Sequence, residues 1–245
     1  KDGRILAVGK TAELAKTYAD TKAFSARGHV VTPGFVDCHL HSSFQLSRGL
    51  ADEANAQSFL FDRMYPYEAA LEAEDVQVSA TLAASELLRH GVTCFVDPGN
   101  YHPEASVEGV MSTGIRMLVS RSSFDLTKSV LGILPERMIE TTAQALERAE
   151  AVLGQYGKTE NPRLRATASF RGLNNASDEL ILGLKGLADT IVHLAPPPTE
   201  GRQDRRTRNV AAILPRQATL VYVSTTGDRK STRLNSSHVK RSRMP

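Results

Sequence analysis

Val31-Thr-Pro-Gly-Phe-Val-Asp-Cys-His-Leu-His41 is an apolar run that leaves a Pro-Gly turn and ends in a His-x-His pair. Successive side chains of a β-strand alternate between its two faces, so His39 and His41 share one face. Cys38 and Leu40 then point to the opposite face. Two imidazoles on one face can bind one metal ion, and each ring can be oriented by a further hydrogen-bond partner. The alternative for an isolated His-x-His is a pair of hydrogen-bonded, inert residues at the end of a strand.

The composition of the 245-residue chain is that of an ordinary globular protein, with 41% apolar and 23% charged residues. This length suits one large α/β domain or two small ones. The apolar runs fall short of about 18 residues, so we expect no membrane span. The first residues are too weakly apolar for a signal peptide, and we expect the true N-terminus to be missing. Cys38 and Cys94 lie in strand-like runs and predict buried thiols in a reducing cytoplasm.

Charge is distributed unevenly along the chain. Residues 202–245 contain eleven Lys or Arg and two acidic residues, a net charge of +9. Residues 1–201 contain nineteen basic and twenty-five acidic residues, a net charge of −6. A basic tail can bind nucleic acid or another acidic surface, which is one alternative function for the chain. Tyr222 is the only aromatic residue of the tail and no base-reading motif is present, so we expect no specific nucleic-acid partner.

Strand and helix patterns alternate along residues 4–195. Apolar runs predict strands over 4–8, 92–97, 115–120, 164–170 and 190–195, in addition to the run that ends at His41. Helical spacing and capping signals predict helices over 11–18, 55–64, 74–89, 104–114, 135–156 and from 177 onward, with Pro66 ending the second of them. This order requires parallel strands with right-handed crossovers, as in a barrel or a doubly wound sheet.

Two features favour the barrel. No G-x-G-x-x-G phosphate fingerprint precedes the strands. Most of the expected strands also end in polar or titratable residues, and in a (β/α)₈ barrel the carboxyl ends of the strands form the active-site face. These residues are His39, His41, Asp97, Ser120, Arg121 and His193.

The His-x-His stretch and the segments after it resemble a known family. Residues 32–41 resemble the first barrel strand of the amidohydrolase superfamily, and four further segments are similar to its branch of cytosine, guanine and S-adenosylhomocysteine deaminases and triazine hydrolases. These segments are residues 46–52, 65–68, 82–89 and 91–97. The resemblance implies an α/β fold in which part of a small β-sandwich (residues 1–31) precedes a partial (β/α)₈ TIM-like barrel (residues 32–200). Residues 201–245 would be a disordered or artefactual basic tail.

The resemblance also implies a function and a metal centre. Members of this branch hydrolyse a C–N bond of a small nitrogen heterocycle with a water activated by one divalent metal ion, zinc first and iron as the alternative. By position, His39, His41 and His193 match three of the family's metal ligands, the alternative for His193 being a hydrogen-bonded strand histidine. Asp97 and Arg171 lie at strand ends and would line the substrate pocket, the alternative for Asp97 being to cap the neighbouring turn. The parent protein would be cytoplasmic, and a homo-oligomeric parent is left open.

The pattern departs from the family after about residue 189. The proton-shuttling Glu expected three residues after His193 is replaced by Pro196. Residues 219–224 could form a sixth strand, but no seventh or eighth strand follows, so the family's Asp ligand is missing. Residues 228–245 resemble translated vector sequence. We therefore expect a fragment with weak or no hydrolase activity, and the remaining alternative is a non-catalytic, metal-binding relative of the barrel.

Overall fold

The computed structural model describes residues 5–129, 132–192 and 221–222, and the chain divides into two compact units, Lys1–Pro33 and Gly34–Pro245. In the first unit, the predicted helix over 11–18 is confirmed as α1 (Thr11–Thr17). The predicted strand over 4–8 is wrong in its described part, because residues 5–8 pair with no other strand. Ile5 and Val8 are 84% and 89% exposed, so no packing surface compensates for an unpaired backbone there.

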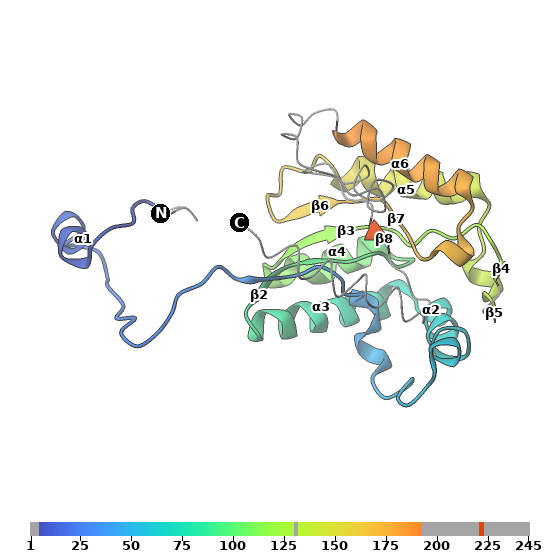
Figure 1. Ribbon diagram of the computed structural model, residues 1–245, viewed down its shortest axis with the longest axis horizontal. Helices are drawn as coiled ribbons and strands as arrows, with labels where there is room; N and C mark the ends of the chain where they lie inside the picture. Colours follow the sequence, from blue (N-terminus) through green and yellow to red (C-terminus); the bar gives the residue numbers. More distant parts are fainter. Residues whose placement is uncertain (1–4, 130–131, 193–220, 223–245) are drawn as a thin grey trace, which may run out of the picture. The chain divides into compact units, whose positions relative to one another are not determined.

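The second unit is built on a four-stranded parallel sheet (Figure 1). Its order is β1-β2-β3-β6, and the parallel α/β architecture expected from the sequence is confirmed. The register places Asp37 beside Phe95, Phe95 beside Met117 and Met117 beside Leu164. The four strands are β1 (Phe35–Asp37), β2 (Val92–Val96), β3 (Arg116–Val119) and β6 (Leu164–Ala166).

Parallel neighbours need crossover connections, and helices supply them. The long helices are α3 (Ala73–Arg89), α4 (Pro103–Thr113), α5 (Thr142–Tyr156) and α6 (Asp178–Val192). A capping box between Glu72 and Asp75 begins α3, and Gly114, with φ +84°, ends α4. Figure 1 shows α3 beside α4 and α5 beside α6.

One apolar core joins these helices to the sheet. Phe95, Met117 and Leu164 belong to one buried cluster with alanine, valine and leucine side chains from all four helices. The alternate strand residues Cys94, Val96 and Leu118 are only half-buried, so the helices cover one face of the sheet. Cys38 is exposed, which corrects the expectation of two buried thiols. Cys38 follows the end of β1 at Asp37, and the side chain of Cys94 alternates with the core residue Phe95 of β2.

Shorter elements connect this framework. The 3₁₀-helix η1 (Ser42–Ser47) follows the His-x-His pair, and a hairpin and a second parallel pair lie further along the chain. These strands are β4 (Lys128–Ser129) with β5 (Gly132–Ile133), and β7 (Ser169–Phe170) with β8 (Val221–Tyr222). The remaining turns are η3 (Glu136–Met138) and η4 (Leu173–Asn175). In the described part of the chain, no helix combines the length and apolar character needed to cross a bilayer.

Three predicted elements have different bounds in the structure. Pro66 does not end a helix, because it lies in the first turn of α2 (Tyr65–Ala70), which continues directly from η2 (Ser58–Met64). The helix predicted over 135–156 begins only at Thr142, where Thr141 and Gln144 form a capping box. The strand predicted over 164–170 is divided into β6 and β7.

The predicted strand over 190–195 is wrong in its described part. Residues 190–192 continue α6 as its last residues. No proline or glycine interrupts the sequence between Leu187 and Ala195, so nothing ends the helix at Asp189 as we expected.

Candidate metal centre

His39 and His41 lie directly after β1, which ends at Asp37. The Leu40 amide donates to the Val96 carbonyl at 3.0 Å, and the Leu40 side chain packs against the helix-covered core. The two histidine rings lie together, with centroids 5.3 Å apart and planes at 78°. This separation allows both rings to reach a single ion, since metal–nitrogen bonds are about 2.0–2.1 Å long.

The ring of His41 has a defined orientation. Its Nδ1 lies 3.1 Å from the Gly99 carbonyl oxygen. A carbonyl can only accept, so Nδ1 carries the hydrogen and the Nε2 lone pair remains available. The ring also stacks on Phe44, with centroids 5.0 Å apart and planes at 25°. Metal-binding histidines show this arrangement, in which the second nitrogen donates to a carbonyl.

The surroundings of both imidazoles favour the neutral form, which is the form that binds metal ions. Burial lowers the pKa of His41 well below 6.5, and the charges of Arg171 and His39 lower it further. Burial and the charge of Arg171 also lower the pKa of His39, while Asp37 opposes this shift. A neutral imidazole offers a metal its lone pair without first losing a proton. His39 and His41 therefore fit two ligand positions of a metal centre.

The structure describes no third ligand beside them. Within residues 5–129, 132–192 and 221–222, no three His, Cys, Asp or Glu side chains form a group that could hold a metal ion. The predicted third ligand, His193, lies outside the described residues. Most of the basic tail, which carries the nucleic-acid alternative, also lies outside them.

Asp97 is completely buried, and its carboxylate is fully engaged in hydrogen bonds. Oδ1 accepts from the Gly99 amide at 2.8 Å, and Oδ2 accepts from both the amide and the hydroxyl of Ser42. Burial raises the pKa of Asp97, and these hydrogen bonds oppose the rise. Asp97 therefore caps the turn after β2, the alternative that the sequence left open, and its side chain does not line the described cavity.

Arg171 is also buried, and its positive charge acts on both imidazoles, since it lowers the pKa of His39 and of His41. One guanidinium nitrogen donates to Glu68 Oε1 at 2.7 Å and to the Ser122 hydroxyl at 2.8 Å. The guanidinium carbon lies 5.2 Å from the centroid of Phe44, the same ring that stacks on His41. Arg171 thus connects the histidine pair with Glu68.

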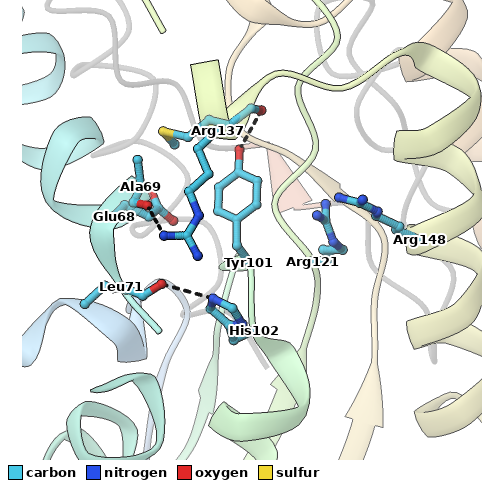
Figure 2. Close-up of a pocket in the computed structure, with 9 residues that line it drawn as sticks. Glu68, Ala69, Leu71, Tyr101, His102, Arg121, Arg137 and Arg148 are labelled. Atoms are coloured by element: carbon cyan, nitrogen blue, oxygen red, sulfur yellow. Dashed lines mark hydrogen bonds between the residues drawn. The ribbon is translucent and has the colours of Figure 1, made fainter. Parts of the chain in front are cut away.

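Glu68, the partner of Arg171 in this ion pair, also lines a cavity of about 160 Å³. Burial raises the pKa of Glu68, and Arg171 opposes the rise. In the view of Figure 2, Arg137 and Arg121 lie on either side of the Tyr101 ring, and Arg121 lies 5.1 Å from the centroid of that ring. The cavity is lined by Glu68, Ala69, Leu71, Tyr101, His102, Arg121, Arg137, Met138 and Arg148.

Sequence reasoning did not identify this cavity. Glu68 stood inside a segment that was quoted only for its family resemblance, and Arg121 was noted only as a strand-end residue. A detectable signal for Glu68 was its helical spacing from Met64 and Tyr65, which places a carboxylate on an apolar face. Nothing local in the sequence indicates that Arg121 would bind both oxygens of Glu140 at 2.7 and 2.9 Å.

Comparison with known proteins supports one family. Residues 30–194 match the model of the amidohydrolase family. The chain is 36% identical over 152 residues to a 5-methylthioadenosine/S-adenosylhomocysteine deaminase of Thermococcus kodakarensis, covering 62% of this chain and 33% of the relative. It is 37% identical over 127 residues to a 5'-deoxyadenosine deaminase of Methanosarcina mazei, covering 51% of this chain and 28% of the relative.

Solved structures share the fold. A guanine deaminase of C. acetobutylicum with bound guanine superposes with a TM-score of 0.57 at 21% identity, covering 65% of this chain and 37% of that one. An adenosine deaminase of Xanthomonas campestris with bound zinc gives a TM-score of 0.56 at 25% identity, covering 65% and 34%. The chain thus spans about a third of the length of these proteins. A match over most of its length, on a parallel α/β unit with a histidine pair at its first strand end, shows that the chain belongs to the amidohydrolase family.

Proposed function

We propose that this chain is part of a metal-dependent hydrolase that deaminates adenosine-type nucleosides. The observation that carries the proposal is the His39–His41 pair, in which the Nδ1–H of His41 is bound by Gly99 and Nε2 is left available. The relatives named for deamination of 5-methylthioadenosine, S-adenosylhomocysteine and 5'-deoxyadenosine support the substrate class. Zinc is the first candidate for the metal, as in the named zinc-bound neighbour, and iron is the alternative.

The residues of the chain would contribute mainly by binding and orientation. A divalent cation at the histidine pair would supply Lewis acidity and a nucleophilic water near neutral pH. His39 and His41 would hold that cation, with His193 as the proposed third ligand. The stack of His41, Phe44 and Arg171 would exclude solvent from one side of the metal centre. The guanidinium of Arg171 would add a positive charge on that side.

The cavity at Glu68 is the proposed place for part of the substrate. Glu68 Oε2 is buried and has no hydrogen-bond partner among the described residues, so it could accept from a hydroxyl or amine of a nucleoside. Arg171 Nε is likewise buried and unpaired in the described part, but Arg171 is not among the residues that line this cavity. A cavity of about 160 Å³ holds only part of such a molecule, since pockets for whole ligands are about 300–1,000 Å³.

We infer that the chain by itself has weak or no activity, because it spans about a third of the length of its relatives. The direct test is a chimera in which residues 1–192 are joined to the remainder of the Thermococcus barrel. Ammonia release from 5-methylthioadenosine is then measured with added zinc or iron. We expect activity in the chimera and only background in its His39→Ala/His41→Ala version. A folded chimera whose activity survives loss of both histidines would contradict the proposed metal centre.

A further inference from the structure

We propose that Asp97 is a positioning residue that fixes the orientation of His41 toward a metal ion. Asp97 does not contact the imidazole. Its carboxylate instead holds the two backbone segments that determine where the imidazole lies. The inference rests on the proposed function only for the identity of the ligand, because the orientation of the ring can be measured without metal.

The first segment is the turn that carries the partner of His41. Asp97 Oδ1 accepts from the Gly99 amide at 2.8 Å, and the Gly99 carbonyl accepts from His41 Nδ1 at 3.1 Å. The carboxylate and the imidazole therefore bind opposite ends of the same glycine. Gly99 has φ +111°, and an added Cβ would overlap the Ser122 amide nitrogen and the Arg121 backbone. This position requires glycine, so the carbonyl that accepts from His41 belongs to a tightly packed turn that other residues cannot form without displacement.

The second segment is the backbone immediately after His41. Asp97 Oδ2 accepts from the Ser42 amide at 3.3 Å and from the Ser42 hydroxyl. The Ser42 carbonyl in turn accepts from the Ser79 hydroxyl of α3 at 2.8 Å. His41 is therefore fixed at its ring through Gly99 and at its backbone through Ser42, and both connections start from one carboxylate.

The carboxylate is itself fixed by the surrounding buried residues. The Asn100 side-chain amide lies 3.5 Å from Asp97 Oδ2 and donates to the Ser106 hydroxyl at 2.7 Å. All of these groups are nearly inaccessible to solvent. The aspartate makes no ion pair among the described residues, so its direct partners are all neutral donors, and Arg171 stabilises its charge without such a contact. Such a residue, at the centre of a neutral hydrogen-bond network, contributes defined geometry, as outer-shell partners of metal-binding histidines do.

Asp125 offers a matched control in the same chain. Its carboxylate accepts from the Ser177 amide at 2.7 Å, from the Thr142 hydroxyl at 2.8 Å and from the Ser177 hydroxyl. It therefore resembles Asp97 in capping a backbone segment with two oxygens, but none of its hydrogen-bond partners contacts His41. Loss of Asp125 should lower stability without changing the imidazole.

The experiment uses the full chain labelled with ¹⁵N-histidine, at a pH where imidazoles are neutral. Ring nitrogen shifts report which nitrogen of His41 carries the hydrogen, and a competition titration reports the affinity for Zn²⁺ alone. For wild type and Asp125→Ala we expect the Nδ1–H form and equal zinc affinity. For Asp97→Ala we expect a mixture of both tautomers and a 10- to 100-fold weaker affinity, the range typical of lost outer-shell partners.

A folded Asp97→Ala variant that keeps the Nδ1–H tautomer and its zinc affinity would overturn the inference. If that variant fails to fold, Asp97→Asn replaces it, since its one remaining acceptor oxygen can serve Gly99 but not also Ser42. We then expect a partial change in tautomer, and an unchanged His41 would again overturn the inference. Failure of wild type to bind zinc would contradict the proposed metal centre, whereas the tautomer comparison would still decide the role of Asp97.

Discussion

Two buried carboxylates near the histidine pair are stabilised in opposite ways. Asp97 is surrounded by neutral donors that occupy both of its oxygens. Glu68 is bound by the permanent charge of Arg171 through Oε1, while Oε2 has no described partner. Burial raises the pKa of both groups, so both are costly to keep ionised. The difference suggests a division of roles: Asp97 holds backbone in place, whereas Glu68, which lines the cavity, keeps one oxygen without a hydrogen-bond partner among the described residues.

The largest expected effect comes from breaking the ion pair. Arg171→Met leaves Glu68 as an uncompensated buried charge, and we expect the free energy of unfolding to fall by about 3–5 kcal/mol. Chemical denaturation of the purified chain measures this change. The double variant Arg171→Met/Glu68→Gln removes the orphaned charge and should recover part of the loss. A double variant as unstable as the single one would show that Glu68 is protonated or otherwise compensated.

Loss of the neutral hydrogen-bond network around Asp97 should lower the free energy of unfolding less than loss of the Arg171–Glu68 ion pair. Asp97→Ala leaves the Gly99 and Ser42 amides without their acceptor, but it also removes the unfavourable desolvation of a buried carboxylate. We expect a decrease of about 1–3 kcal/mol in the free energy of unfolding, by the same denaturation assay. Asp125→Ala serves as the control for a lost capping carboxylate. A loss larger than that of Arg171→Met would reverse the proposed order of the two carboxylates.

The histidines should make stability depend on pH below 6.5. Their pKa values are lower in the folded protein than the ordinary 6.5, so the unfolded chain takes up protons first and acid favours unfolding. Glu68 and Asp97, whose pKa values are raised, act in the opposite direction. The comparison of wild type with His39→Asn/His41→Asn isolates the imidazole contribution, which is at most about 1.4 kcal/mol per pH unit for each ring. Parallel stability curves between pH 7.5 and 5.5 would contradict the lowered pKa values.

The smallest effect is expected at an exposed ion pair. Arg137 and Glu72 pair at 2.7 Å, but their side chains are 55% and 65% exposed. Solvent screens this pair, so Arg137→Ala should change the free energy of unfolding by no more than about 0.5 kcal/mol. A loss of stability comparable to that of Arg171→Met would mean that solvent exposure does not explain how much the two ion pairs contribute to the free energy of unfolding.

The framework of the barrel could be predicted because its signals are local. The apolar runs of β2 and β3 and the caps of α3 and α4 gave elements close to those observed. Errors arose where a second local signal overrode the helical spacing or where a strand had no partner. Because Thr141 and Gln144 form a capping box, α5 begins at Thr142, later in the sequence than predicted. Residues 5–8 form no strand because they have no partner strand.

The candidate site could be predicted only in part, for a related reason. His39 and His41 form a pattern two residues apart, which strand alternation explains. Glu68 and Arg171 are separated by 103 residues, and no periodicity in the sequence indicates that they would pair. The role of Asp97 was open because a strand-end aspartate can face a pocket or cap a turn, and only the positions of Ser42 and Gly99 decide between these.

The central claim is that His39 and His41 together form the metal-binding part of this chain. The most direct test is a Zn²⁺ titration of the full chain by calorimetry, with metal content checked by mass spectrometry. The His29→Ala/His90→Ala variant is the control, since it removes two exposed imidazoles that do not belong to the His-x-His pair. We predict one zinc ion per chain in wild type and control and none in His39→Ala/His41→Ala. Unchanged stoichiometric zinc binding after loss of His39 and His41 would contradict the account.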